Sequence, residues 1–512
     1  MANGEDRAAS VFGNAQDPKV YEKACRGKEG FVKRFGDDSG TVYHLRATST
    51  PAIGEPLGVR NLRLAKGGAA APALDLAADA AAQPPAPATP RTVGDAAGKP
   101  LVVGNIRMGF GHYRISMAMA SAARAMGYTP YWLDLAGFPE STGSKVIAYQ
   151  NKLYSMGSRL SQAVPPFNAA VWEPLNSEGF RKLSYNAGDQ KNAELCVPLF
   201  RDLPRDVPYI GTHAWPSQAA VHAGLTHVVN AVPDNWPMAL HLAEGSIHAV
   251  QTPGAYLGYK ELRGMWPGHV LKPMPDDAIA YTGHYVDHEL VANIEADCAA
   301  RRERVLGGGP VRYLLSVGGA GAQSELFCAI CEKLLPYVRR GEAVLFVNVG
   351  DHRKVWKELA KKVAGLRDEA QLHFGDFEEV RAFAETALTG EVTGIHAFCD
   401  DDIFAAVYSS NLLMRCSDVL VTKPSEFSFY PVPKLMIHRV GGHEAWGAIR
   451  AAEVGDGTYE IDDTAEVLGM LDSFQADREL IAAMCDRIED ANRIGVYDGA
   501  YRCVELAANG HV

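Results

Sequence analysis

A histidine lies beside two glycines at a point where a strand is expected to give way to a helix. Residues 101–103 form an apolar run typical of a buried strand, and residues 115–126 are rich in helix formers. A glycine turn between a strand and a helix can present backbone N–H groups to an anion. Gly109 and Gly111 would let a ligand approach the backbone closely. His112, whose proton moves near neutral pH, would lie beside that ligand as a candidate general base. The alternative is a purely structural turn.

A second turn of the same kind opens the second half of the chain. Gly318 and Gly319 follow the apolar run 313–317 and precede the amphipathic stretch 323–335. This arrangement predicts a second phosphate-binding turn. The two glycines are therefore candidate nucleotide-binding residues, again with an ordinary turn as the alternative.

Polar side chains follow two further apolar runs, 419–422 and 435–437. Lysine can neutralise a phosphate, whereas hydroxyl, imidazole and carboxylate groups suit ribose or sugar hydroxyls. The candidate nucleotide-sugar-binding residues are Lys423, Ser425, Glu426, Ser428, His443 and Glu444. A solvated loop with a Lys–Glu pair is the alternative interpretation.

Two strand ends in the first half also carry polar residues. Thr212 and His213 follow the run 209–211, and Asp234 follows the run 227–232. His213 and Asp234 are expected to line the site, and Asp234 is the second catalytic candidate. No pattern such as H-E-x-x-H is present, so we expect neither a metal site nor a cofactor.

The stretch 144–187 differs from the acidic remainder because it mixes basic and aromatic residues. Such a mixture suits an anionic membrane surface or an amphipathic acceptor, and the alternative is a helical excursion packed on the domain. The residues concerned are Lys145, Lys152, Arg159, Arg181 and Lys182 with Tyr149, Tyr154, Phe167, Trp172, Phe180 and Tyr185.

Alternating apolar runs and amphipathic stretches predict the elements that position these residues. Expected strands of the first series are 101–103, 131–135, 209–211, 227–232 and 247–251; those of the second are 313–317, 344–349, 395–398, 419–422 and 435–437. Two such series predict an α/β protein with two doubly wound Rossmann-type domains that face a central cleft. The expected divisions are an N-terminal extension 1–68, an Ala/Pro-rich linker 69–98, domains 99–288 and 289–476, and a helical tail 477–512.

Composition excludes several classes of protein. A formal net charge of −11 argues against nucleic-acid binding. The sequence contains neither an apolar run of membrane-spanning length nor an N-terminal export signal. Nine cysteines in 512 residues suggest free thiols, and the pair Cys328 and Cys331 is expected to be buried in a helix. We therefore expect a cytoplasmic protein, or one bound peripherally to the inner face of a membrane.

From residue 101 to residue 458 the motif order resembles one family of glycosyltransferases. These are the GT-B enzymes related to monogalactosyldiacylglycerol synthase, processive diacylglycerol glucosyltransferase and peptidoglycan N-acetylglucosaminyltransferase. The matching motifs are Gly109-Phe110-Gly111-His112, Ala231-Val232-Pro233-Asp234 with Trp236, Thr282-Gly283, Gly318-Gly319-Ala320-Gly321, Met414, Asp418, Thr422-Lys423 and Gly441-Gly442-His443-Glu444.

The resemblance implies transfer of a sugar from a UDP-sugar on the second domain to a hydroxyl acceptor on the first. The acceptor could be a lipid, and no metal would be needed. The chain departs from the family pattern in a shorter segment at 424–433 and in carrying His443 and Gly447 where the family has glutamine and asparagine. Two alternatives stay open, namely a UDP-sugar epimerase and a binding protein without catalytic activity.

Overall fold

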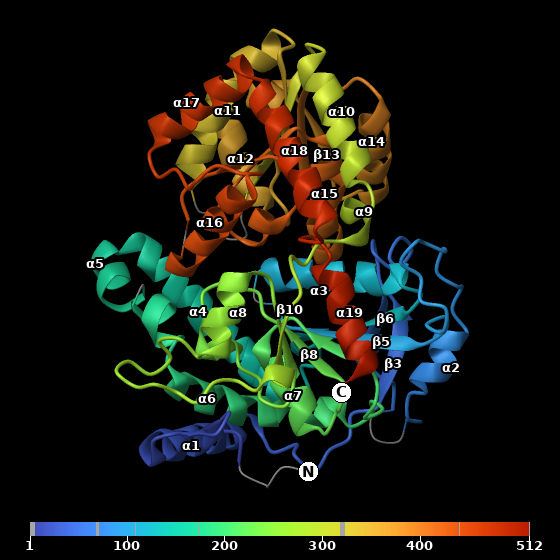
Figure 1. Cartoon of the computed structure of the whole chain (residues 1–512), viewed down its shortest axis with the longest axis vertical. Coiled ribbons are helices and arrows are strands. Elements are labelled where there is room, and N and C mark those ends of the chain that lie inside the picture. Colours follow the sequence, from blue (N-terminus) through green and yellow to red (C-terminus); the bar gives the residue numbers. More distant parts are fainter. Residues whose placement is uncertain are drawn as a thin grey trace.

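The computed structural model describes residues 6–67, 71–107, 109–172, 174–317, 323–439 and 441–510. It contains two α/β domains, drawn one above the other in Figure 1, with the N-terminal half of the chain in the lower domain. Each domain is built on its own largely parallel sheet. The expected fold class of two doubly wound α/β domains is confirmed.

The first domain contains an eight-stranded sheet in the order β10-β9-β8-β7-β5-β6-β4-β3. Neighbouring strands are parallel except β3 and β4, which are antiparallel. The strands are β3 Leu45–Ser49, β4 Arg60–Leu64, β5 Pro100–Asn105, β6 Thr129–Asp134, β7 Tyr209–Gly211, β8 Val228–Ala231, β9 Ile247–Val250 and β10 Ile279–Tyr281. The helices are α1 Pro18–Phe35, α2 Leu76–Ala81, α3 Gly111–Ala125, α4 Thr142–Ala163, α5 Pro165–Phe167, α6 Leu183–Ala193, α7 Ala214–His222, α8 Pro253–Lys260 and α9 His288–Val291.

The second domain contains a six-stranded parallel sheet in the order β13-β14-β12-β11-β15-β16. The strands are β11 Val311–Ser316, β12 Ala343–Asn348, β13 Ala370–Phe374, β14 Gly394–Cys399, β15 Val419–Thr422 and β16 Lys434–Met436. The helices are α10 Ile294–Leu306, α11 Ser324–Arg339, α12 Arg353–Lys362, α13 Leu366–Glu369, α14 Phe377–Thr389, α15 Ile403–Cys416, α16 Ala445–Val454, α17 Thr464–Ala476, α18 Glu479–Arg493 and α19 Gly499–Asn509. Cys328 and Cys331 are buried on α11, as expected.

The N-terminal extension is not the separate piece that its position before the linker suggested. β4 pairs in parallel with β6, and β3 then forms the edge of the first sheet. Leu45 and Leu62 are buried in the core beneath these strands. The extension is part of the first domain because it supplies two strands of that domain's sheet.

The Ala/Pro-rich segment is likewise not a free tether. Asp75 caps α2, whose Leu76 and Ala80 are buried. Asp79 pairs with Arg60 of β4 and accepts a hydrogen bond of 2.6 Å from the Tyr131 hydroxyl. A few apolar and charged residues thus anchor a segment whose average composition predicts a linker.

The C-terminal tail divides between the two domains. α18 packs along α10 of the second domain, whereas α19 packs on α3 and against β7 and β8 of the first. The red helix α19 can be followed into the lower domain in Figure 1. The first domain is therefore completed by the end of the chain.

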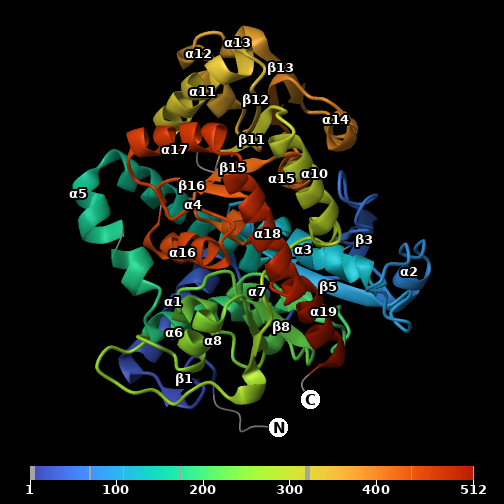
Figure 2. The same ribbon diagram turned by 45° about the horizontal axis from the view of Figure 1, so that its top comes forward.

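A helical arm, α4 to η4 (Leu175–Gly179), extends from the first domain. It lies beside α16 of the second domain in both views (Figures 1 and 2), and η4 contacts η9 (Gly442–Glu444). Within the described ranges, no helix combines the length and apolar character that a membrane span requires.

Candidate functional site

The candidate residues gather where the carboxyl ends of the two sheets meet. His112 follows β5 and Asp234 follows β8, both in the first domain. Lys423 follows β15 and Glu444 follows β16, both in the second. In open parallel sheets the carboxyl ends of the strands are the usual place for a ligand. We call the meeting of these strand ends the interdomain seam.

Both glycines of the first turn have a structural reason to be glycine. Gly109 has a φ of +87°, which a side chain would strain. A Cβ on Gly111, the first residue of α3, would overlap the carboxylate of Glu426 from the second domain. Glu426 therefore reaches across the seam to the start of α3. The sequence predicted a ligand at this helix N-terminus, and in the structure a carboxylate of the same chain lies beside it.

Two more contacts hold the turn against the second domain. Arg107 pairs with Asp351 at 3.1 Å. The ring of Phe110 lies against His352, with 5.7 Å between ring centroids, and close to Gly350. The domains therefore meet closely at the predicted anion-binding turn.

His112 has a defined tautomer. Its Nδ1 lies 2.7 Å from the carbonyl oxygen of Thr212. Because a carbonyl oxygen only accepts, Nδ1 must carry the proton, and Nε2 of the neutral ring keeps a lone pair. Burial lowers the pKa of His112, although the hydrogen bond to Thr212 and the carboxylate of Glu426 oppose that shift. A neutral imidazole with a basic Nε2 is what a general base requires.

Two more histidines belong to this cluster. His213 lies next to His112, with ring centroids 4.8 Å apart, and it caps α7 by accepting the Trp215 N–H at Nδ1. His241 contacts Asp234 through Nε2 at 2.8 Å. His213 could be found because it directly follows a strand. His241 could not, because nine residues separate it from the end of β8.

Lys423 and Glu444 form an ion pair on the second-domain side of the seam. Burial acts to lower the pKa of Lys423, but the carboxylates of Glu444, Glu426 and Asp234 outweigh it and raise that pKa. The Gly441 N–H donates to the other oxygen of Glu444 at 3.2 Å. This lysine therefore keeps its positive charge, and its field reaches Asp234 of the first domain.

The remaining predicted binding residues fare differently. Ser425 is half-buried beside Lys423. Ser428 is buried and packs against Gly447 of α16, with its hydroxyl near the Met436 sulfur. Gly318, Gly319 and the side chain of His443 lie outside the described residues.

Aromatic side chains also meet at the seam. Trp236 of the first domain stacks on Trp446 of α16, with centroids 5.1 Å apart and planes 16° apart. The guanidinium of Arg181 covers the ring of Trp236 at 4.3 Å.

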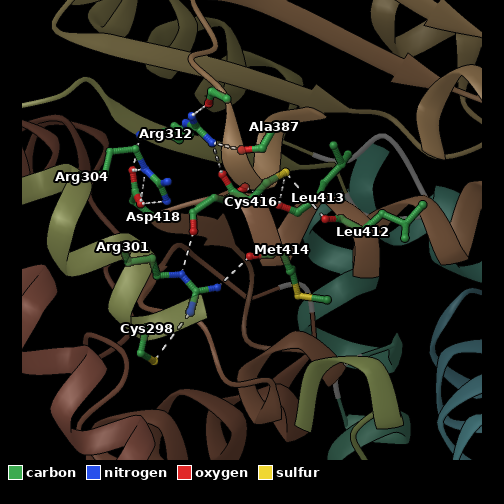
Figure 3. A network of polar contacts seen from close by, with 12 residues as sticks. Cys298, Arg301, Arg304, Arg312, Ala387, Leu412, Leu413, Met414, Cys416 and Asp418 are labelled. Atoms are coloured by element: carbon green, nitrogen blue, oxygen red, sulfur yellow. Dashed lines mark hydrogen bonds and ion pairs between the residues drawn. The ribbon is translucent and has the colours of Figure 1, made fainter. Parts of the chain in front are cut away.

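Asp418, one of the residues that match the glycosyltransferase motifs, has a structural role in this fold. It is fully buried at the amino end of β15, where Arg304 binds its carboxylate and the Arg312 N–H donates to it at 2.8 Å (Figure 3). The neighbouring Arg301 donates to the carbonyl oxygens of Met414 and Ser417. This network fastens β15 to α10 and β11 at the sheet end opposite the seam.

One group of described residues could place three donor atoms around a cation. His438, Glu460 and Asp462 bring one ligand atom each within 4.8 Å of one another. However, Asp462 already contacts His438 at 2.8 Å, and Arg439 pairs with Glu460. The cluster is thus already bridged by hydrogen bonds and an ion pair within the chain.

Sequence comparison divides the chain close to the structural boundary. Residues 10–261 match the domain of unknown function DUF6937. Residues 274–508 match the domain of unknown function DUF6938. The first match begins within the N-terminal extension, and the second includes α19. No curated protein sequence matches the chain.

Solved structures of similar outline include sugar-nucleotide enzymes. UDP-GlcNAc 2-epimerase from Neisseria meningitidis, bound to UDP-GlcNAc, is 11% identical, with 80% of this chain and 98% of that one covered and a TM-score of 0.41. A putative UDP-N-acetylglucosamine 2-epimerase from Listeria monocytogenes is 13% identical, with 80% of this chain and 95% of that one covered and a TM-score of 0.41. A UDP-forming trehalose-phosphate synthase from Burkholderia vietnamiensis is 12% identical, with 80% of this chain and 100% of that one covered and a TM-score of 0.37. Likenesses at this level carry no conclusion about the activity of this chain.

Proposed function

We propose that the protein transfers a sugar from a nucleotide-sugar donor to a hydroxyl acceptor. One observation carries the proposal: a neutral histidine with a basic Nε2 on the first domain faces a seam whose other side holds a charged lysine. These are His112 and Lys423. Glu426, which touches the start of α3, acts on both: it raises the pKa of Lys423 and opposes the lowering of the pKa of His112. The resemblance of the motifs makes a UDP-sugar the expected donor.

The residues then have distinct parts in the reaction. The acceptor oxygen forms a bond to the anomeric carbon while the bond from that carbon to the diphosphate oxygen breaks. Nε2 of His112 takes the acceptor proton, and the bonding electron pair leaves with the nucleoside diphosphate. Lys423 stabilises the negative charge that grows on the diphosphate, because a fixed cation needs no reorganisation during the reaction. Asp234, held by His241, is the second candidate base.

The donor is expected to lie mainly on the second domain. Glu444 and Ser425 would bind its hydroxyl groups, together with His443. Gly318 and Gly319 are the candidate residues for its phosphates. The start of α3, where the Glu426 carboxylate lies, also suits an anionic group of the donor. When the donor binds, Glu426 would leave this position and contact the donor or His112.

A lipid acceptor has support on the surface beside the seam. The arm and α16 expose large apolar side chains, namely Leu153, Tyr154, Met156, Leu160, Val164, Val171, Leu175, Trp446 and Ile449. Lys152 and Lys182 are exposed nearby. Exposed apolar side chains with basic residues among them are typical of a lipid or membrane contact. Arg181 is not one of these exposed basic residues, because it stacks on Trp236.

The full-length protein should be incubated with UDP-glucose, UDP-galactose and UDP-GlcNAc, with and without glycerol or dioctanoylglycerol. Transfer predicts that UDP is released and that the acceptor raises the rate. Epimerisation would convert the sugar without any acceptor, and a binding protein would bind UDP in calorimetry and do neither.

His112→Asn is the decisive variant. An asparagine amide can still donate to the Thr212 carbonyl but has no atom at the place of Nε2. Turnover should fall by about 10²-fold or more while UDP affinity stays unchanged. His269→Asn, an exposed histidine of the same domain, is the matched control. A wild-type protein that binds no nucleotide, or a His112→Asn variant with full turnover, contradicts the assignment.

A further inference from the structure

Two adjacent histidines are held in opposite tautomers at the seam. The carbonyl of Thr212 fixes the proton of His112 on Nδ1. The Trp215 N–H, which only donates, fixes a lone pair on Nδ1 of His213 and so places that ring's proton on Nε2. Burial lowers the pKa of both rings, that of His213 far below its usual value. Both are therefore neutral near pH 7.

The two Nε2 nitrogens consequently differ in kind. Nε2 of His112 is an acceptor and Nε2 of His213 is a donor. Within the described part of the chain neither of these two nitrogens has a hydrogen-bond partner. The rings are in edge contact, with 4.8 Å between centroids and 70° between planes.

One acceptor next to one donor is complementary to a hydroxyl group. An alcohol donates its proton to the first nitrogen and accepts from the second through its oxygen. A carboxylate or phosphate would need two donors, and the lone pair of His112 would repel it. An ammonium would need two acceptors, and the N–H of His213 would repel it.

We propose that His213 is a second residue of the acceptor site, whose Nε2–H binds the acceptor oxygen and turns its proton toward His112. The inference rests on the proposed function and deepens it, because it names a second residue that binds the acceptor hydroxyl. The charged or titratable groups that act on the pair are Glu426, Asp234 and His241. His213 itself takes no proton, and its hydrogen bond holds the oxygen in line for attack.

The tautomers can be measured without any substrate. In the full-length protein labelled with ¹⁵N-histidine, the ring-nitrogen shifts near pH 7 should show a protonated Nδ1 for His112 and a protonated Nε2 for His213. The variants His112→Asn and His213→Asn assign the signals. A cationic ring at either position, or the same tautomer at both, overturns the proposal whether or not the protein is a transferase.

The variant His213→Asn distinguishes the two roles of this side chain, namely the N-cap of α7 through Nδ1 and the hydrogen-bond donor at Nε2. Asparagine is a favoured N-cap, so it should keep the contact with the Trp215 N–H and the thermal stability of α7. It has no atom at the place of Nε2. UDP release with glycerol as acceptor should fall about tenfold in kcat/KM, the value of one neutral hydrogen bond, while calorimetric UDP affinity stays unchanged. His213→Gln, whose amide N–H can reach the place of Nε2, should recover part of the loss.

The outcomes separate this inference from the broader proposal. If the wild type transfers sugar and His213→Asn keeps full kcat/KM for glycerol, His213 has no place in the acceptor site while the transferase function stands. If the wild type transfers to an amine or a carboxylate better than to a hydroxyl, the assignment of acceptor class is wrong. If the wild type transfers nothing, the transferase proposal fails, and the acceptor role of His213 fails with it.

Discussion

A buried carboxyl group between the two domains should make stability fall as pH rises. Asp287 is fully buried at the start of α9 and accepts a hydrogen bond of 2.8 Å from Tyr430 of the second domain. Burial, with a contribution from Glu289, raises its pKa from 3.8 to about 8, and Arg114 acts in the opposite direction. The folded protein therefore keeps this carboxyl protonated in a range where the unfolded chain releases the proton.

The direction and size of the effect follow from linkage. Between pH 3.8 and about 8 the folded state binds one proton more than the unfolded state. The free energy of unfolding then loses about 1.4 kcal/mol per pH unit from this group, or about 3 kcal/mol between pH 5 and pH 7. This loss in the free energy of unfolding is absent at low pH, and it is complete above the pKa that Asp287 has in the folded state.

Asp287→Asn removes this titration and keeps an oxygen for the Tyr430 hydroxyl. Relative to wild type, the variant should gain about 3 kcal/mol between pH 5 and pH 7, or about 6–12 °C in the melting temperature of a unit of this size. Thermal and guanidinium unfolding measured at several pH values test this, with the exposed Asp277→Asn as control. Parallel pH profiles for wild type and Asp287→Asn would refute the reasoning.

Two further predictions concern the N-terminus and the arm. Deleting residues 1–67 should leave an insoluble or strongly destabilised chain, because the deletion removes β3 and β4. The buried leucine of each strand contributes about 2 kcal/mol to the stability of the fold. A fragment that melts at the same temperature as the full protein would contradict the sheet described here. The wild type should sediment with vesicles containing phosphatidylglycerol at low salt, and Leu153→Ser with Met156→Ser should reduce that binding, since both side chains are exposed on the arm. Leu306→Ser, an exposed position on the second domain, is the control, and equal binding by all three proteins would exclude the arm as the contact.

The parts of the fold that could be predicted from the sequence are those with buried apolar runs. The runs at 209–211 and 419–422 coincide with β7 and β15 because all residues of these strands are buried. β13 has no such run, since its central residues face solvent and Leu372 is half exposed. Periodicity therefore indicated the middle of each sheet and the edge strand β16, and it missed the edge strands β10 and β13.

The sequence could predict candidate residues within each domain, but it could not predict the contacts between the two domains. Position after a strand identified His112, His213 and Lys423, because strand ends can be recognised from local sequence. The contact of Glu426 with Gly111 joins residues from two domains, and no local pattern indicates such a contact. The tautomers could not be predicted either, because they depend on which backbone groups the folded chain places next to each imidazole.

The return of α19 to the first domain affects how the protein is made. The hydrogen bond from the Gly499 N–H to the His284 carbonyl and the contact of Tyr501 with His288 close the first domain only when these late residues are present. On the ribosome, α3, β7 and β8 emerge early and then wait, with the apolar surface that α19 covers still open, while the whole second domain is synthesised. The order of synthesis thus makes the first domain the last to be finished. A nascent chain stalled before residue 499 should be more sensitive to protease in its first half than the released protein.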